Sequence, residues 1–89
     1  MTELEKMWTA LSAHQPIADR MGYGTQWQCM CNQRTTMAAD AAHAAATGAV
    51  KIASNAAAAA AYAARLTIDA DYYFNKTIAH ITKANGEQA

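Results

Sequence analysis

The sequence predicts an all-α protein in which three or four helices surround one long alanine-rich central helix. The central stretch Met37–Arg65 reads MAADAAHAAATGAVKIASNAAAAAAYAAR, and alanine has the highest intrinsic helix propensity. The larger apolar side chains lie mainly before and after this stretch, so the two ends are expected to clamp it. A chain of 89 residues has room for one small core, which predicts a single helical domain over residues 1–89.

The first helix begins with a capping box, in which Thr2 caps the helix and Glu5 reaches back toward it. Leu4, Trp8 and Leu11 follow at i, i+4 and i+7 and form one apolar stripe. Because a proline disfavours helical backbone in the residue before it, Pro16 predicts that this helix ends by Gln15.

Short elements fill the chain from Ile17 to Arg34. Ile17–Met21 can form one helical turn, and the sequence Gly22-Tyr23-Gly24 then predicts a break. Thr25 is expected to cap a helix over Gln26–Arg34. This helix should pack Trp27 and Met30 against the alanine surface.

The central helix has capping residues at its start and two weak points inside it. Thr35 and Thr36 can accept from free N–H groups at its first turn. Gly48 costs about 1 kcal/mol relative to alanine inside a helix, so a bend near it is expected. Ser54-Asn55 is the second weak point, because both side chains compete for backbone hydrogen bonds.

Alanine buries little area but allows helices to approach closely, toward the short end of the usual ~8–10 Å between axes. The alanine surface therefore suits either the core of this bundle or a second chain, and the sequence leaves both readings open.

After the central stretch, Leu66–Asp69 predicts a bend or turn, and Asp69 can cap the next helix. The last helix should end at Asn85-Gly86, which is a good helix stop. Residues 87–89 are then expected to be frayed.

Composition argues against several classes of function. Seven basic and seven acidic residues give zero formal charge without a run of either sign, whereas nucleic-acid binders usually carry a basic patch. Asp40 and Lys51 would be costly inside a bilayer, so the alanine stretch does not predict a membrane span. With no apolar leader at the start, we expect a cytoplasmic protein whose cysteines are reduced.

The cysteines and histidines do not predict a metal centre or a catalytic dyad. Cys29 and Cys31 are two residues apart, so on a helix they point about 200° apart, and no second closely spaced pair of ligands accompanies them. Nothing in the sequence indicates an acid and a pocket that would orient a Cys–His pair. We therefore expect no enzyme activity, no metal and no cofactor.

Three consecutive aromatic residues suggest a contact surface for a partner. Tyr72, Tyr73 and Phe74 cannot all face one core from a helix, so at least one should be exposed, and exposed tyrosine is a common interface anchor. Tyr72 and Tyr73 are therefore candidate partner-binding residues. Tyr62 and Arg65, three apart near the end of the alanine helix, are candidates for the same patch.

Thr36 and Thr47 are eleven residues apart in or beside the alanine helix. Alanine-rich helical antifreeze proteins align threonines at this spacing on one ice-facing side, so an ice-binding role is a third possibility. The register fails at Ala58 and Asp69, where threonine should recur.

Three stretches resemble small alanine-rich accessory proteins of tailed bacteriophages. They are Leu11–Asp19 (LSAHQPIAD), the alanine helix, and Ile78–Ala84 (IAHITKA). The resemblance is one of style rather than of a site motif, so it transfers no functional residues. It implies a counter-defence role, as in anti-CRISPR proteins, exerted in the host cytoplasm by covering a surface of a host complex.

The sequence thus predicts non-enzymatic binding to a host protein complex, most concretely inhibition by steric occlusion. The alternative is a self-assembling structural protein whose alanine faces pair between copies.

Overall fold

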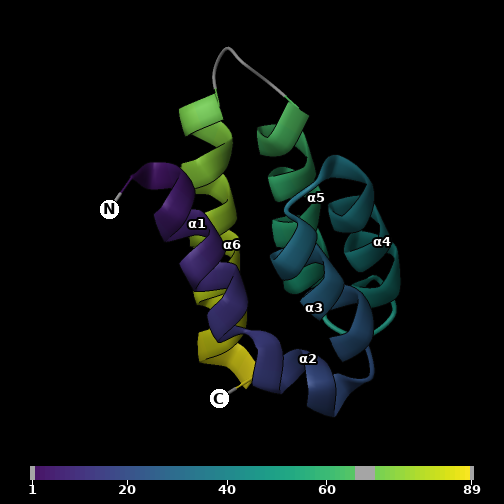
Figure 1. Cartoon of the computed structure of the whole chain (residues 1–89). Helices are drawn as coiled ribbons and strands as arrows, with labels where there is room; N and C mark the ends of the chain where they lie inside the picture. Colours follow the sequence, from purple (N-terminus) through teal and green to yellow (C-terminus); the bar gives the residue numbers. More distant parts are fainter. Residues whose placement is uncertain (1, 66–69, 89) are drawn as a thin grey trace.

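A computed structural model describes residues 2–65 and 70–88, which form helices and no strand (Figure 1). The all-α prediction is confirmed. The six helices of the described residues are α1 (Glu3–Ala13), α2 (Gln15–Met21), α3 (Gly24–Gln33), α4 (Thr36–Ala46), α5 (Lys51–Arg65) and α6 (Ala70–Gln88).

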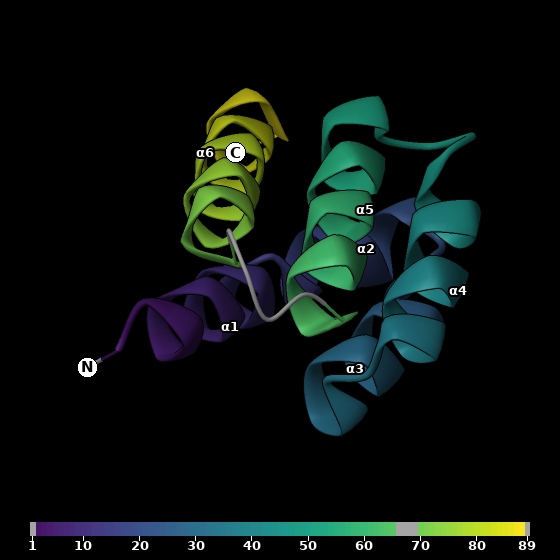
Figure 2. The same ribbon diagram turned by 90° about the horizontal axis from the view of Figure 1, so that it is seen from above.

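Helix α5 lies between α4 and α6 and packs on both of them (Figures 1 and 2). Helix α1 packs against α6, and α3 packs against α4. The short helix α2 joins α1 to α3 at one end of the bundle. The C-terminus lies at this same end, beside the junction of α1 and α2.

The predicted arrangement of three or four helices around one long central helix is matched only in part, because the alanine stretch is divided into the hairpin α4–α5. Residues 47–49 form a turn, and Gly48 lies in it without contacts that would exclude a side chain. Thr47 ends α4 and donates its hydroxyl hydrogen to the carbonyl oxygen of His43. The buried side chain of Val50 then fixes the return of the chain into α5. The expected bend at Gly48 is thus a complete reversal of direction.

The N-terminal helix is close to the prediction. Thr2 accepts from the backbone N–H of Glu5, and Trp8 and Leu11 are buried. The carboxylate of Glu5 binds the hydroxyl of Thr2 rather than its backbone N–H. Leu4 stays 44% exposed at the edge of the apolar stripe.

The chain breaks between α2 and α3 at Gly22-Tyr23, as predicted. Gly22 ends α2 with a positive φ of 95°, which glycine adopts without strain. A side chain at Gly24 would overlap Asp19, so the packing of α3 on α2 requires glycine there. Thr25 does not cap α3, because that helix already begins at Gly24 and Tyr23 occupies the capping position.

The expected weak point at Ser54-Asn55 does not interrupt α5, and the expected stop at Asn85-Gly86 does not end α6. Both places involve side chains that form tertiary contacts. Helix α5 continues through Ser54, which is buried and bonded to α4 rather than to its own backbone. Helix α6 continues past Asn85 to Gln88 because Asn85 binds His14 instead of ending the helix. Of the residues expected to be frayed, 87 and 88 are helical and 89 lies outside the described residues, as does the predicted junction Leu66–Asp69.

The core has an alanine part and a part made of large side chains. The intramolecular reading of the alanine surface is confirmed for its inner face. The buried alanines of the hairpin are Ala38, Ala39, Ala42, Ala46, Ala53, Ala56, Ala57, Ala59, Ala60, Ala61 and Ala63. Trp27 and Met30, on α3, are fully buried in the same cluster, as predicted.

Candidate protein-binding face

The outward side of α5 carries its few long polar and aromatic side chains. Helix α5 has an outward stripe between its contacts with α4 and α6, and the positions of this stripe recur at i, i+4, i+7, i+11 and i+14. Its members, all exposed or half-buried, are Lys51, Asn55, Ala58, Tyr62 and Arg65. Tyr62, at the end of α5 beside α6, is 45% exposed.

The first turns of α6 place one aromatic ring in solvent and two at the seams with neighbouring helices. Tyr72 is 57% exposed, whereas Tyr73 and Phe74 are half-buried. The buried residue Thr77 marks the inward side of the helix, and its hydroxyl donates to the carbonyl oxygen of Tyr73. The prediction that at least one of the three aromatics is exposed is therefore confirmed.

Three tyrosines form a continuous row across the outer seam of α5 and α6, with a cation at each end. Tyr62 and Tyr73 are stacked with ring centroids 5.4 Å apart, and Tyr73 meets Tyr72 edge to face at 5.0 Å. The guanidinium carbon of Arg65 lies 4.5 Å from the ring centroid of Tyr62. At the other end, the amine of Lys76 lies 5.2 Å from the ring centroid of Tyr72 and donates to its hydroxyl at 3.1 Å. We call these five residues the tyrosine row.

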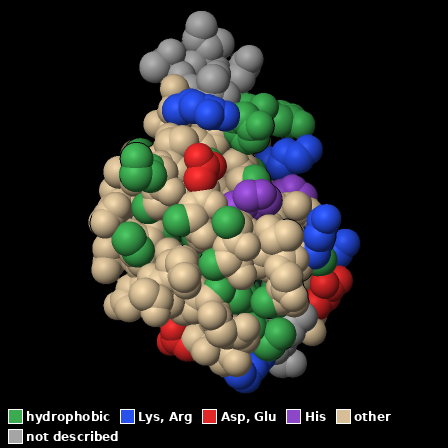
Figure 3. All heavy atoms as spheres, turned by 90° about the vertical axis from the view of Figure 1, so that its right-hand side faces the viewer, with side chains coloured by type: hydrophobic (Ala, Val, Ile, Leu, Met, Phe, Trp, Pro, Cys, Tyr) green, Lys and Arg blue, Asp and Glu red, His purple; other side chains and the backbone are tan. Residues whose placement is uncertain are grey.

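The tyrosine row contains all four residues that the sequence singled out for partner contact. Sequence reasoning missed Lys76, although its position four residues after Tyr72 on a helix predicts that their side chains meet. Figure 3 shows apolar side chains gathered below the grey atoms, with basic side chains on both sides of them. Each cation–π contact contributes about 0.5–1 kcal/mol at an exposed site, so the contacts hold the rings in place.

Neither cation of the tyrosine row forms an ion pair with a described residue. An ion pair of the described residues joins Lys6 to Glu3 on α1, away from this row. Within the described residues, no carboxylate in direct contact therefore neutralises Arg65 or Lys76.

A second polar cluster ties α4 to α5 inside the hairpin. The hydroxyl of Ser54 lies 2.7 Å from Nδ1 of His43 and 3.0 Å from the hydroxyl of Thr47. Ser54 is only 2% exposed. A buried hydroxyl held by two neighbours fixes the distance between the helices and offers no surface to a substrate.

His14 forms the polar centre of the large-side-chain core. Its Nδ1 lies 2.7 Å from the amide oxygen of Asn85, which can only accept, so Nδ1 carries the proton. Its Nε2 then accepts from the hydroxyl of Tyr23 at 2.6 Å. Burial lowers the pKa of His14, while the bond to Asn85 opposes this shift. Burial also raises the pKa of Tyr23 to about 12, which keeps its hydroxyl protonated as the donor.

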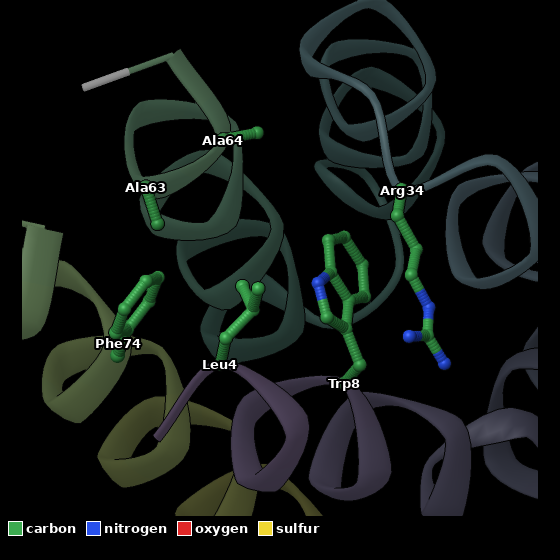
Figure 4. Close-up of a pocket in the computed structure, with 6 residues that line it drawn as sticks. All are labelled: Leu4, Trp8, Arg34, Ala63, Ala64 and Phe74. Atoms are coloured by element: carbon green, nitrogen blue, oxygen red, sulfur yellow. The ribbon is translucent and has the colours of Figure 1, made fainter. Parts of the chain in front are cut away.

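One pocket of about 340 Å³ lies on the other side of the α5–α6 seam (Figure 4). Its lining residues are Leu4, Trp8, Arg34, Ala63, Ala64 and Phe74. Figure 4 shows Trp8 between Leu4 and Arg34, and the guanidinium carbon of Arg34 lies 5.6 Å from the centroid of the Trp8 ring. The small side chains of Ala63 and Ala64 leave this space open opposite the large ring.

Both cysteines are free thiols on α3, each half-buried. Burial raises the pKa of Cys31, although contacts with Ser12 and Arg34 act in the opposite direction. Among the described residues, no three His, Cys, Asp or Glu side chains lie close enough together to hold a metal ion. Within the same residues, no helix has the length and apolar character needed to cross a membrane.

No protein-family model, curated protein or solved structure matches this chain.

Proposed function

We propose that this chain is a non-enzymatic binding protein that contacts a partner protein through the tyrosine row. The observation that carries this proposal is the continuous contact from Arg65 through Tyr62, Tyr73 and Tyr72 to Lys76. Tyrosine and arginine are enriched among residues that dominate binding energy at protein interfaces. Rings already held by neighbouring side chains lose little conformational entropy when a partner binds.

The resemblance to phage accessory proteins extends this proposal to a host complex as the partner. The mechanism is then occlusion, in which the bundle covers a surface that the host complex needs. Because the inner alanines pack inside the fold, the occluding surface is the tyrosine row rather than the alanine face.

Self-assembly through alanine faces is less well supported. The inner alanines of the hairpin are used within one molecule, and the outer side of α4 presents Met37, Asp40, Ala41 and Ala44. A copy placed on this surface would bring apolar area but also bury the charge of Asp40, which costs free energy unless it is paired.

The ice-binding reading is also less well supported. Thr36 begins α4 and donates its hydroxyl hydrogen to the carbonyl oxygen of Ala61. Thr47 lies past the end of α4 and donates to the carbonyl oxygen of His43. Both hydroxyls are therefore occupied within the molecule rather than aligned on an outer helix face.

The test compares pull-downs from a bacterial lysate by the tagged wild-type chain and by the double variant Tyr62→Ala/Tyr72→Ala. Both rings are exposed, so their removal should leave the bundle folded, which circular dichroism will check. We expect a host complex recovered with the wild type to be depleted at least about tenfold with the double variant.

Met37→Ala is the matched control. Met37 is 83% exposed on α4, so its substitution removes exposed apolar area away from the tyrosine row. It should recover the same complex at wild-type yield. Equal recovery by the double variant and the wild type would refute the proposal. Light scattering of the purified chain tests the alternative, since self-assembly requires a mass that rises with concentration.

A further inference from the structure

The outer face of α5 and α6 carries an excess of positive charge. Helix α5 contains no Asp or Glu, and its outward stripe includes Lys51 and Arg65. On α6, Tyr73 begins a stripe along one side of the helix. The positions at i+3, i+7 and i+10 from it hold Lys76, His80 and Lys83. We call these four Lys and Arg residues, together with the tyrosine row, the basic face.

Among the described residues of α5 and α6, few carboxylates compensate for this charge. Four of the seven Lys and Arg residues of the chain lie on the basic face. Of the two acidic residues in α6, Asp71 lies about 200° around the helix from Tyr73. Glu87 continues the stripe at i+14, four residues after Lys83 and about 16 Å along the helix axis from Lys76, so it offsets Lys83 rather than the two cations of the tyrosine row. Although the whole chain has zero net charge, this face is therefore locally basic.

The tyrosine rings reinforce the attraction for negative groups. The electron-rich face of an aromatic ring attracts cations, whereas its edge is electropositive. Arg65 and Lys76 already lie over the faces of Tyr62 and Tyr72, and Tyr62 and Tyr73 are stacked on each other. What the row leaves for a partner is ring edges, hydroxyl groups and two cations.

We propose that the partner presents an acidic protein segment to the basic face, with carboxylates that pair with Arg65 and Lys76. This inference rests on the proposed function and names the chemistry of its partner. The carboxylates would reach the two ends of the tyrosine row, and apolar side chains between them would lie on the tyrosine rings.

Nucleic acid fits this face less well than an acidic protein segment. Proteins that bind single strands without sequence preference use open aromatic faces on which bases stack. Here the ring faces are used by Arg65, Lys76 and the tyrosines themselves. A second copy of the chain is also disfavoured, because two basic faces in contact would repel each other.

The experiment pans a random-peptide display library on the immobilised full chain and measures the enriched peptides by fluorescence anisotropy. We expect enriched sequences with a net negative charge and at least two Asp or Glu residues. Their affinity should fall about tenfold in Arg65→Gln/Lys76→Gln, which removes both charges and keeps the rings. It should also fall as salt rises from about 50 to about 200 mM, because screening weakens exposed ion pairs.

The matched control is Lys6→Gln/Arg20→Gln, which makes the same change in net charge away from the basic face. It should bind the peptides within about twofold of the wild type if local charge matters more than total charge. A loss of affinity as large as that of the test variant would overturn the inference.

The other outcomes separate this inference from the proposed function. Neutral or basic peptides whose binding still requires Tyr62 and Tyr72 would refute the acidic partner and leave the tyrosine row as a binding site. An absence of peptides that depend on those tyrosines would refute both. If a labelled oligo(dT) strand competed with the peptides at equal or higher affinity, the partner would be nucleic acid rather than an acidic protein segment.

Discussion

Nε2 of His14 accepts a hydrogen bond from the hydroxyl of Tyr23 at 2.6 Å. Both side chains lie in the core, where His14 is 0% exposed and Tyr23 is 1% exposed. The two rings are also stacked with centroids 5.8 Å apart. Because Asn85 holds the opposite nitrogen of His14, this one imidazole connects the start of α3 to the end of α6.

Replacing Tyr23 by phenylalanine should destabilise the fold although it keeps the ring. The variant leaves Nε2 of His14 buried without a donor, and an unsatisfied buried polar group costs about 1–3 kcal/mol. Urea denaturation followed by circular dichroism measures this loss. Tyr72→Phe is the control, since Tyr72 is exposed, and its free energy of unfolding should match that of the wild type.

Stability should fall as the pH drops below about 6.5, the ordinary pKa of histidine. Burial lowers the pKa of His14 in the folded state, so the unfolded chain binds the proton first. The loss begins near the unfolded pKa and continues down to the folded pKa, with a slope of at most about 1.4 kcal/mol per pH unit from this group. Melting temperatures measured at several pH values will show this trend.

His14→Gln is the comparison variant for the pH series. Glutamine does not titrate, so this part of the pH dependence should disappear even if the variant is less stable at every pH. An unchanged slope between the variant and the wild type would mean that His14 does not cause it.

Arg34→Gly should be more stable than Arg34→Ala by about 1 kcal/mol. Arg34 ends α3 with a φ of 55°, the one positive φ outside glycine among the described residues. Both variants lose the contact with Trp8, so their difference isolates the backbone conformation. Thermal unfolding of the two proteins gives this difference, and equal midpoints would contradict it.

Enlarging a buried alanine of α5 should be costly. Ala60 is fully buried, so Ala60→Leu forces α5 away from its neighbours and should destabilise by about 1–3 kcal/mol. Ala64→Leu is the matched control, because Ala64 is exposed at the rim of the pocket. Chemical denaturation of both variants should show a loss for position 60 alone.

The helical class and several boundaries could be predicted because they depend on local chemistry. Thr2 and Gly22 act on the backbone within one turn of the chain, and the structure confirms both effects. The first helix ends before Gln15 as predicted, but Gln15 itself is helical and Pro16 lies in the first turn of α2. Gly48 was identified as a weak point, but local propensity does not reveal a reversal whose stability comes from packing α4 on α5. Asn85, with Gly86 after it, locally predicts the end of a helix. Its side chain instead forms a tertiary hydrogen bond with His14.

In the candidate site too, features set by local helix geometry could be predicted, whereas contacts set by helix packing could not. Helical geometry predicts that at least one of Tyr72, Tyr73 and Phe74 is exposed, because three adjacent residues of a helix cannot share one face. It does not predict which one, and the structure shows that it is Tyr72. The contact between Tyr62 and Tyr73, eleven positions apart, depends on how α5 and α6 pack. Lys76 belongs to the site because its amine donates to the hydroxyl of Tyr72.

The alanine-lined interior of the α4–α5 hairpin also restricts how the gene can drift. Single-base changes in an alanine codon give valine, threonine, proline, aspartate, glutamate, serine or glycine. Of these, glycine adds no heavy atom and serine adds one. The others add larger side chains or a charge, or in the case of proline break the helix, where neighbouring backbones are close. Descendants of this sequence should therefore keep a ladder of small residues in the hairpin after its outer positions have diverged, and that ladder is the pattern by which distant relatives can be recognised.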